Sequence, residues 1–190
     1  LWGGGTPSEW AYIQIRLPAV PARQGGGDAL WGDILIAVIA RDSRQLEKIA
    51  AKTEGTELAR WAMAFATEIR LQMQESRGLL TTNGPGAEEN DRLLTDAAKN
   101  YRNIISETTN SLLKRRAQFA LAQVLECVSD ITTASQIYAT LAKAHPNLAS
   151  GRAATRRKNT LNRSSIKAFS AWFFQQELRA PLPATPSGKS

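Results

Sequence analysis

The sequence predicts an all-α protein built as a short array of antiparallel helix pairs. From Asp28 onward apolar residues recur at helical spacing, Ala, Leu, Glu, Gln, Lys and Arg dominate, and Gly and Pro are confined to a few breaks. No segment of this region is a convincing strand. With 190 residues, of which 43% are hydrophobic, the chain can bury a core without disulfides or metal. Helices joined by short breaks bury their apolar faces against each other as antiparallel neighbours.

The breaks give the expected helix boundaries. Asp28 can cap the first helix, Asp42 or Ser43 the second, and Thr56 opens a longer third. Asn-Gly and Pro-Gly pairs make residues 81–86 a loop. The expected helices are 28–40, 43–52, 56–78, 87–106, 112–128, 131–144, 148–162 and 164–178.

The two ends of the chain differ from this helical region, which we assign to residues 28–179. Residues 1–27 hold two Gly triplets and three prolines, a composition typical of an extended or disordered arm. Within the arm, the apolar residues 10–17 could pair as a strand or lie along a groove. Residues 180–190 are expected to be a disordered tail. Because the sequence begins at Leu1 rather than Met, we expect it to be a fragment or a processed form.

The net charge of +7 belongs to one part of the chain. No acidic residue lies between Asp130 and Glu177, and seven basic residues do. On a helix over 148–162, the spacing places Arg152, Arg156 and Arg163 on one face and turns Leu148, Ala154 and Leu161 inward. This basic patch could bind nucleic acid, an anionic membrane or an acidic protein, or it could be a solvated face whose arginine stems cover the core. Its members are Arg152, Arg156, Arg157, Lys158 and Arg163.

The composition argues against enzyme chemistry. His145 is the one histidine and Cys127 the one cysteine, whereas zinc sites and histidine-based triads need several such groups. We therefore expect no catalysis, no metal and no cofactor. The longest apolar run, residues 29–40, contains Asp33 and is shorter than the ~20 residues that span a bilayer, so it is predicted to be a buried helix.

An internal repeat is present. Ala97-x3-Tyr101 recurs as Ala134-x3-Tyr138, and Pro146 follows the second copy. Small residues at such positions let paired helices cross closely. The 34-residue unit 115–148, with Gln118-x2-Leu121-Ala122-x2-Leu125 in its first helix, resembles the tetratricopeptide repeat, although Gln118 and Leu125 replace the motif's usual Trp and Tyr.

An upstream unit pairs Leu58-x2-Trp61-Ala62-x2-Phe65 with Ala97-x3-Tyr101 after an insertion of 23 residues, and Trp31-Gly32-x2-Leu35 suggests a third. The resemblance covers about residues 28–162 and implies a right-handed superhelix; a non-repetitive bundle is the alternative. A capping helix with Phe169, Trp172 and Phe173 would cover the last unit. This ending resembles bacterial envelope-associated tetratricopeptide proteins, the ancillary translocon-subunit and cell-division-coordinator group, which implies an inner-membrane tether upstream of Leu1.

The resemblance also implies a ligand groove lined by the first helix of each pair. In the unit 115–148 the groove positions fall on Arg116, Phe119, Gln123, Glu126 and Cys127. Arg116 could hold a peptide carboxylate, Phe119 an apolar side chain and Gln123 backbone amides. The expected function is a non-catalytic scaffold that binds a protein or peptide partner. Docking of the basic patch on nucleic acid or an anionic membrane is the alternative.

Overall fold

The structure, a computed structural model, describes residues 27–76 and 87–163, and all regular secondary structure in these two ranges is helical. The prediction of an all-α fold is confirmed. The expected positions of residues 1–26, the loop 81–86, the capping helix 164–178 and the tail 180–190 lie outside the described residues. The helices are α2 (Gly27–Ile39), α3 (Ser43–Lys52), α4 (Glu57–Ser76), α5 (Ala87–Glu107), α6 (Ser111–Cys127), α7 (Ile131–Ala144) and α8 (Ala149–Leu161).

Side-chain caps fix four of the helix starts, and at the start of α4 the hydroxyl of Thr56 accepts a hydrogen bond of 3.2 Å from the amide of Ala59. Asp42, Asn110 and Asp130 precede α3, α6 and α7, and their side-chain oxygens accept hydrogen bonds of 2.9–3.1 Å from backbone N–H groups two or three residues on. Such caps satisfy amides that have no partner within the helix. The start of α2 differs from the prediction by one residue, because the helix runs from Gly27 and the backbone of Asp28 is already helical.

Tight turns join α3 to α4 and α6 to α7. Gly55, between α3 and α4, has a φ of +80°, a left-handed conformation that glycine adopts at low cost. Ser129 has a φ of +66° in the short link from α6 to α7, where the amides of Ser129 and Asp130 donate to the carbonyls of Glu126 and Leu125. This left-handed turn ends α6 and reverses the chain, so α7 packs back against α6.

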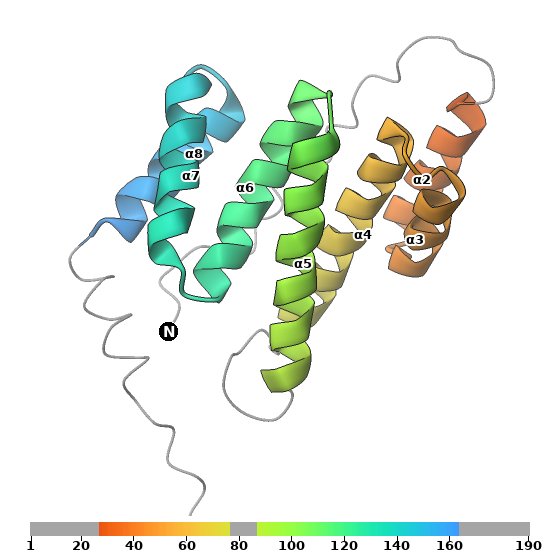
Figure 1. Cartoon of the computed structure of the whole chain (residues 1–190), viewed down its shortest axis with the longest axis horizontal. Helices are drawn as coiled ribbons and strands as arrows, with labels where there is room; N and C mark the ends of the chain where they lie inside the picture. The colour runs from red at the N-terminus through yellow and green to blue at the C-terminus, as the bar shows by residue number, and fades with distance from the viewer. Residues whose placement is uncertain (1–26, 77–86, 164–190) are drawn as a thin grey trace, which may run out of the picture.

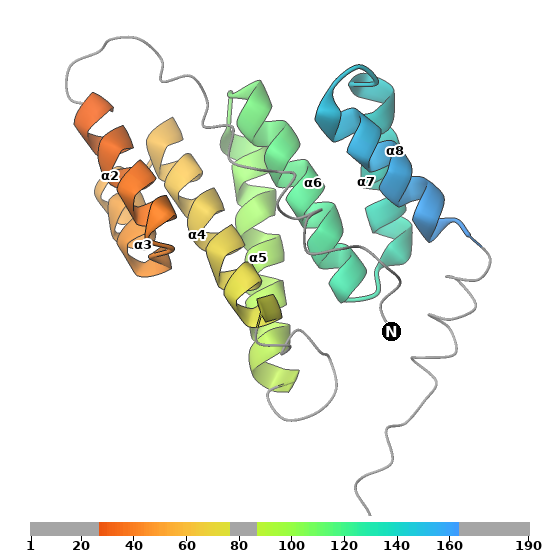
Figure 2. The ribbon, with the colours of Figure 1, turned by 180° about the vertical axis from the view of Figure 1, so that it is seen from behind.

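The helices form a row, with α2 and α3 at one end and α7 and α8 at the other (Figure 1). The view from behind in Figure 2 shows the same order. Extensive contacts join only helices that are one or two places apart in the chain, among them α3 with α4, α5 with α6, and α7 with α8. The fold of the described helices is therefore built from neighbour contacts.

Two close backbone approaches hold the second half of the row. Ala122 of α6 and Ala134 of α7 are fully buried where these helices pack. Gly151, in the first turn of α8, lies so close to the end of α7 that an added Cβ would sit 1.8 Å from the carbonyl oxygen of His145. Small residues at these positions allow the tight packing of α6, α7 and α8.

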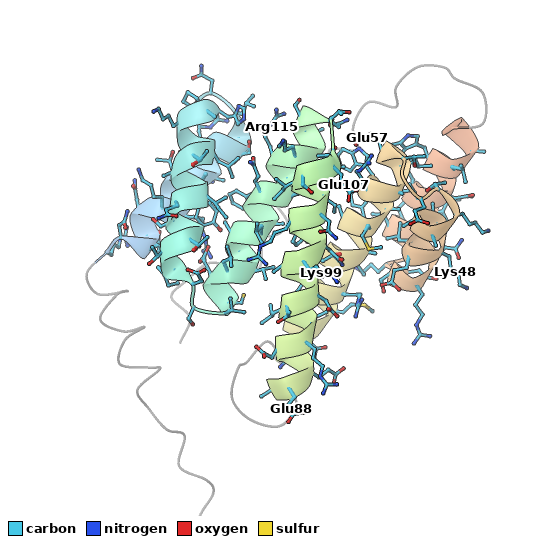
Figure 3. The ribbon with its side chains drawn as sticks, viewed as in Figure 1. Lys48, Glu57, Glu88, Lys99, Glu107 and Arg115 are labelled. Atoms are coloured by element: carbon cyan, nitrogen blue, oxygen red, sulfur yellow. The ribbon has the colours of Figure 1, made fainter. Side chains whose placement is uncertain are left out.

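A polar contact joins the start of α4 to the link between α5 and α6. The carboxylate of Glu57 accepts hydrogen bonds from the hydroxyl of Thr108 at 2.6 Å and from the amide of Thr109 at 2.8 Å. Arg60 donates to Glu57 and to Glu107, each at 3.4 Å. Figure 3 shows Glu57, at the start of α4, and Glu107, at the end of α5, near each other in the upper part of the view. None of the helices in the described ranges is both long and apolar enough to cross a membrane.

Candidate functional site

The predicted groove residues lie on α6, which is enclosed by three other helices. α6 packs against α5, α7 and α8, and its buried residues point in several directions. Leu113, Ala117, Leu121 and Leu125 are among them. The predicted groove residues therefore lie on a helix of which much of the surface is already covered by α5, α7 and α8.

Arg116 is engaged by an acid from another helix. Its Nε donates to Oε1 of Glu68 on α4 at 2.7 Å, and a second guanidinium nitrogen donates to the other carboxylate oxygen. The guanidinium also stacks over the ring of Phe65, 5.0 Å from its centre. Burial by itself lowers the pKa of Arg116, but the charge of Glu68 outweighs it and raises the pKa above the ordinary value. The pair links α4 to α6 through a bidentate contact.

Glu126 is engaged in the same way at the other end of α6. The hydroxyl of Tyr138 on α7 donates to Oε1 of Glu126 at 2.6 Å, and Arg157 on α8 donates to both carboxylate oxygens, at 2.6 and 3.2 Å. Burial, followed by the charge of Glu126, raises the pKa of Tyr138 well above its ordinary value, so the phenol stays protonated and remains a donor. Glu126 thus joins three helices.

The remaining groove positions are Phe119, Gln123 and Cys127. Phe119 is 6% exposed and packs edge-on against Tyr138, with ring centres 5.2 Å apart. Gln123 and Cys127 are partly exposed. The five residues do lie along one helix, but the structure does not present them as one open surface: two form interhelical ion pairs and Phe119 belongs to the core.

An arrangement that sequence reasoning missed recurs along the row. The charges of Glu68 and Arg116 act on the pKa of Tyr101 of α5, and those of Glu126 and Arg157 act on the pKa of Tyr138 of α7. Tyr138 also donates a hydrogen bond to Glu126. In both places the tyrosine of the Ala-x3-Tyr pattern lies beside an acid and an arginine from other helices. The pattern marks both tyrosines in the sequence, but no local signal links Glu68 to Arg116, since 48 residues separate them.

The residues of the predicted basic patch lie on α8 and directly after it. Arg152 and Arg156 on α8 and Arg163, beyond the C-cap residue Asn162, are exposed, and Ala154 and Leu161 are buried. The expectation that Leu148 faces inward is wrong: it is 43% exposed, because it precedes the first turn of α8 as the N-cap residue.

The members of the patch differ in their ionic contacts. Arg157 turns toward α6 and pairs with Glu126, whereas Arg152 donates to the carbonyl oxygen of Asn147 at 2.8 Å. Among the described residues, no carboxylate lies within ion-pair distance of Arg152, Arg156, Lys158 or Arg163. Four of the five cations are therefore not neutralised by a direct partner in this part of the chain.

Two shallow hollows flank α7. One, of about 300 Å³, lies between α5 and α7 over α6 and is lined by Ile105, Gln118, Leu121, Gln136, Ile137 and Thr140. The other, of about 390 Å³, lies between α7 and α8 and is lined by Ile131, Thr132, Ser135, Gln136, Ala139, Lys158 and Asn162. The described residues contain no cluster of His, Cys, Asp and Glu that could hold a metal ion.

Comparison of the sequence with protein-family models, and of the chain with curated proteins and solved structures, gave no match.

Proposed function

We propose that this protein is a non-catalytic scaffold that binds a protein or peptide partner through a tetratricopeptide-like helical array. The observation that carries the proposal is the row of helices in which extensive contacts are made between near neighbours (Figures 1 and 2). Such arrays expose a long surface for their size and commonly use it to bind other chains. The same resemblance extends the proposal to a bacterial cell-envelope setting.

The packing of α6 on α7 supports a repeat of this kind. Ala122 and Ala134 are fully buried, and Leu121, Leu125 and Tyr138 fill the space around them. Ala97 and Tyr101 of α5 are buried in the same way as their counterparts in α7. Equivalent positions thus have equivalent burial in two successive pairs, as expected if one structural unit is repeated.

The partner surface in this proposal is centred on Gln123. Arg116 and Glu126 hold α4 and α8 in place, so a ligand would engage them at their remaining exposed edges. The side-chain amide of Gln123, partly exposed between them on α6, can donate to and accept from a peptide backbone.

Selection of peptides from a random display library against the full chain tests the proposal. We expect enriched peptides that bind with micromolar affinity by calorimetry, and an affinity at least about tenfold lower for Gln123→Arg. Asn103→Arg, which adds the same charge at an exposed position of α5, is the matched control and leaves the affinity unchanged. If no peptide is enriched, or if both variants bind as tightly as the wild type, the proposal fails.

The basic patch favours a second function, docking on nucleic acid or an anionic membrane through Arg152, Arg156, Arg157, Lys158 and Arg163. The observation behind it is the exposed arginine face without described carboxylate partners. The double variant Arg152→Glu, Arg156→Glu should abolish binding to oligonucleotides and anionic vesicles if this function is correct, and should spare the selected peptides if the first is. Loss of peptide binding with polyanion binding intact would contradict the first proposal.

A further inference from the structure

The N-terminal end of the row carries an exposed apolar face. Ile36 and Ile39 on α2 are 68% and 81% exposed, more than any other large apolar side chain in the described ranges. Their helix is apolar on nearly all sides, and only Ile34, Ala37 and Val38 are buried in the core. Exposed isoleucines on one helix face, which water solvates poorly, are typical of a contact surface.

The opposite end of the row carries a hollow with a partly apolar lining. Ile131 and Ala139 of α7 provide its apolar part, and Lys158 of α8 and the C-cap residue Asn162 close one side. Its volume of about 390 Å³ leaves room for side chains from another molecule. α2 and α8 lie at opposite ends of the row in both views (Figures 1 and 2), so the apolar face of α2 cannot reach the hollow of its own chain.

The apolar face of α2 and the α7–α8 hollow also carry side chains of opposite charge. The segment 27–39 contains no Lys or Arg, and Asp33 is exposed on the same side of α2 as Ile36. The segment 131–163 contains no Asp or Glu, and Lys158 lines the hollow.

We propose that copies of this chain associate head to tail, with the apolar face of α2 of one copy seated in the α7–α8 hollow of the next. Ile36 and Ile39 enter the hollow beside Ile131 and Ala139, and Asp33 faces the basic end. Because the two surfaces differ, each copy in a pair keeps one unused surface, and the association continues into longer assemblies unless the rotation between copies closes a ring.

The contact involves one helix face and one hollow, so it is at the small end of protein interfaces. We therefore expect weak self-association. In sedimentation velocity with the full chain, the average mass should rise steadily between roughly 10 µM and 1 mM, without a stop at the dimer. Raising the salt concentration should lower the average mass, because it screens the attraction between Asp33 of one copy and the cations at the other end of the next copy.

Two sets of substitutions test the α2 face and the α7–α8 hollow independently. Ile36→Lys with Ile39→Lys removes the apolar face and opposes the basic end, and it should hold the protein monomeric. Met73→Lys, at a half-exposed position on α4 away from both ends, is the matched control and should associate like the wild type. Thr132→Arg fills the hollow from an exposed position and should also give a monomer, with circular dichroism confirming that each variant is folded.

Mixing the two monomeric variants is the decisive measurement. The isoleucine variant keeps an intact hollow and the Thr132 variant keeps an intact α2, so the mixture should form dimers and nothing larger. A wild-type chain that stays monomeric throughout the concentration range overturns the proposal. This result is expected if residues 164–178 cover the hollow of their own chain. Association that survives Thr132→Arg also overturns it, because the contact would then join two α2 faces.

Discussion

Gly151 is the residue at which the packing of the row leaves the least space. A Cβ there would lie 1.8 Å from the carbonyl oxygen and 2.6 Å from the carbonyl carbon of His145, and backbone atoms cannot rotate away. We expect Gly151→Ala to destabilise the protein by about 2–3 kcal/mol, although alanine is the better helix former. Urea unfolding followed by circular dichroism measures the free energy of unfolding.

Gly32 is the control for this substitution. It lies in the middle of α2, and an added Cβ would have no neighbour within 4 Å outside the local backbone. Gly32→Ala should therefore stabilise the protein by about 0.5–1 kcal/mol through its helix propensity. If Gly151→Ala and Gly32→Ala changed the free energy of unfolding equally, the close approach of α8 to His145 would be contradicted.

Removing the hydroxyl should change the free energy of unfolding differently at the two repeated tyrosines. The hydroxyl of Tyr101 is buried and has no hydrogen-bond partner among the described residues, so Tyr101→Phe should leave the free energy of unfolding within about 0.5 kcal/mol of wild type or raise it. The hydroxyl of Tyr138 donates to Glu126 at 2.6 Å, so Tyr138→Phe should cost about 1.5–3 kcal/mol. Equal losses from the two substitutions would contradict the difference in their contacts.

At the scale of helices, Glu57 makes the contact between α4 and the α5–α6 link dependent on pH. Burial acts to raise the pKa of Glu57, but hydrogen bonds from Thr108 and Thr109 and the charge of Arg60 outweigh it, and the pKa is lowered. A carboxyl group whose pKa is lower in the folded state stabilises the fold above its ordinary pKa of about 4.3, and that stability is lost as the pH falls through the lowered value.

The variant Glu57→Gln tests this dependence. It should be less stable than wild type at pH 7, and the difference in the free energy of unfolding should shrink as the pH falls below about 4.3. Denaturant titrations at a series of pH values measure it. A difference that stayed constant down to the acid limit would mean that the charge of Glu57 is not involved.

The sequence was sufficient to predict most of the elements, because the signals that end and begin helices are local. Asp42 and Asp130 cap the helices that follow them, and Thr56 precedes α4 as expected. Leu148 was placed wrongly because helical periodicity says nothing about a residue that lies before the first turn.

The predicted groove residues show what local sequence patterns cannot predict. Helical spacing correctly places Arg116 and Glu126 on one helix, but their partners come from other elements. Glu68 is 48 residues from Arg116, and Arg157 is 31 residues from Glu126. Only the packing of α4, α6 and α8 brings these charges together, so their use as ties between helices could not be predicted from spacing.

At the scale of the whole molecule, contacts between near neighbours imply that the described helices do not all open together. In such an array local stability depends on the number of neighbours that each helix buries. α6 packs against α5, α7 and α8, and it is tied to α4 by Glu68 and to α8 by Arg157. Within the described row, α2 and α8 lie at the ends.

We therefore expect native-state hydrogen exchange to be slowest for amides in α4 and α6, each of which packs against three other helices, and fastest for those in α2 and α8. Gly151→Ala should lower the free energy of opening in α8 and α7 and leave α4 nearly unchanged, because α4 makes no extensive contact with α7 or α8. Exchange measured by mass spectrometry on peptides from each helix provides the comparison. If the substitution lowered protection equally in every helix, the protein would unfold as one cooperative unit, and the physical basis for treating it as a helical array would be lost.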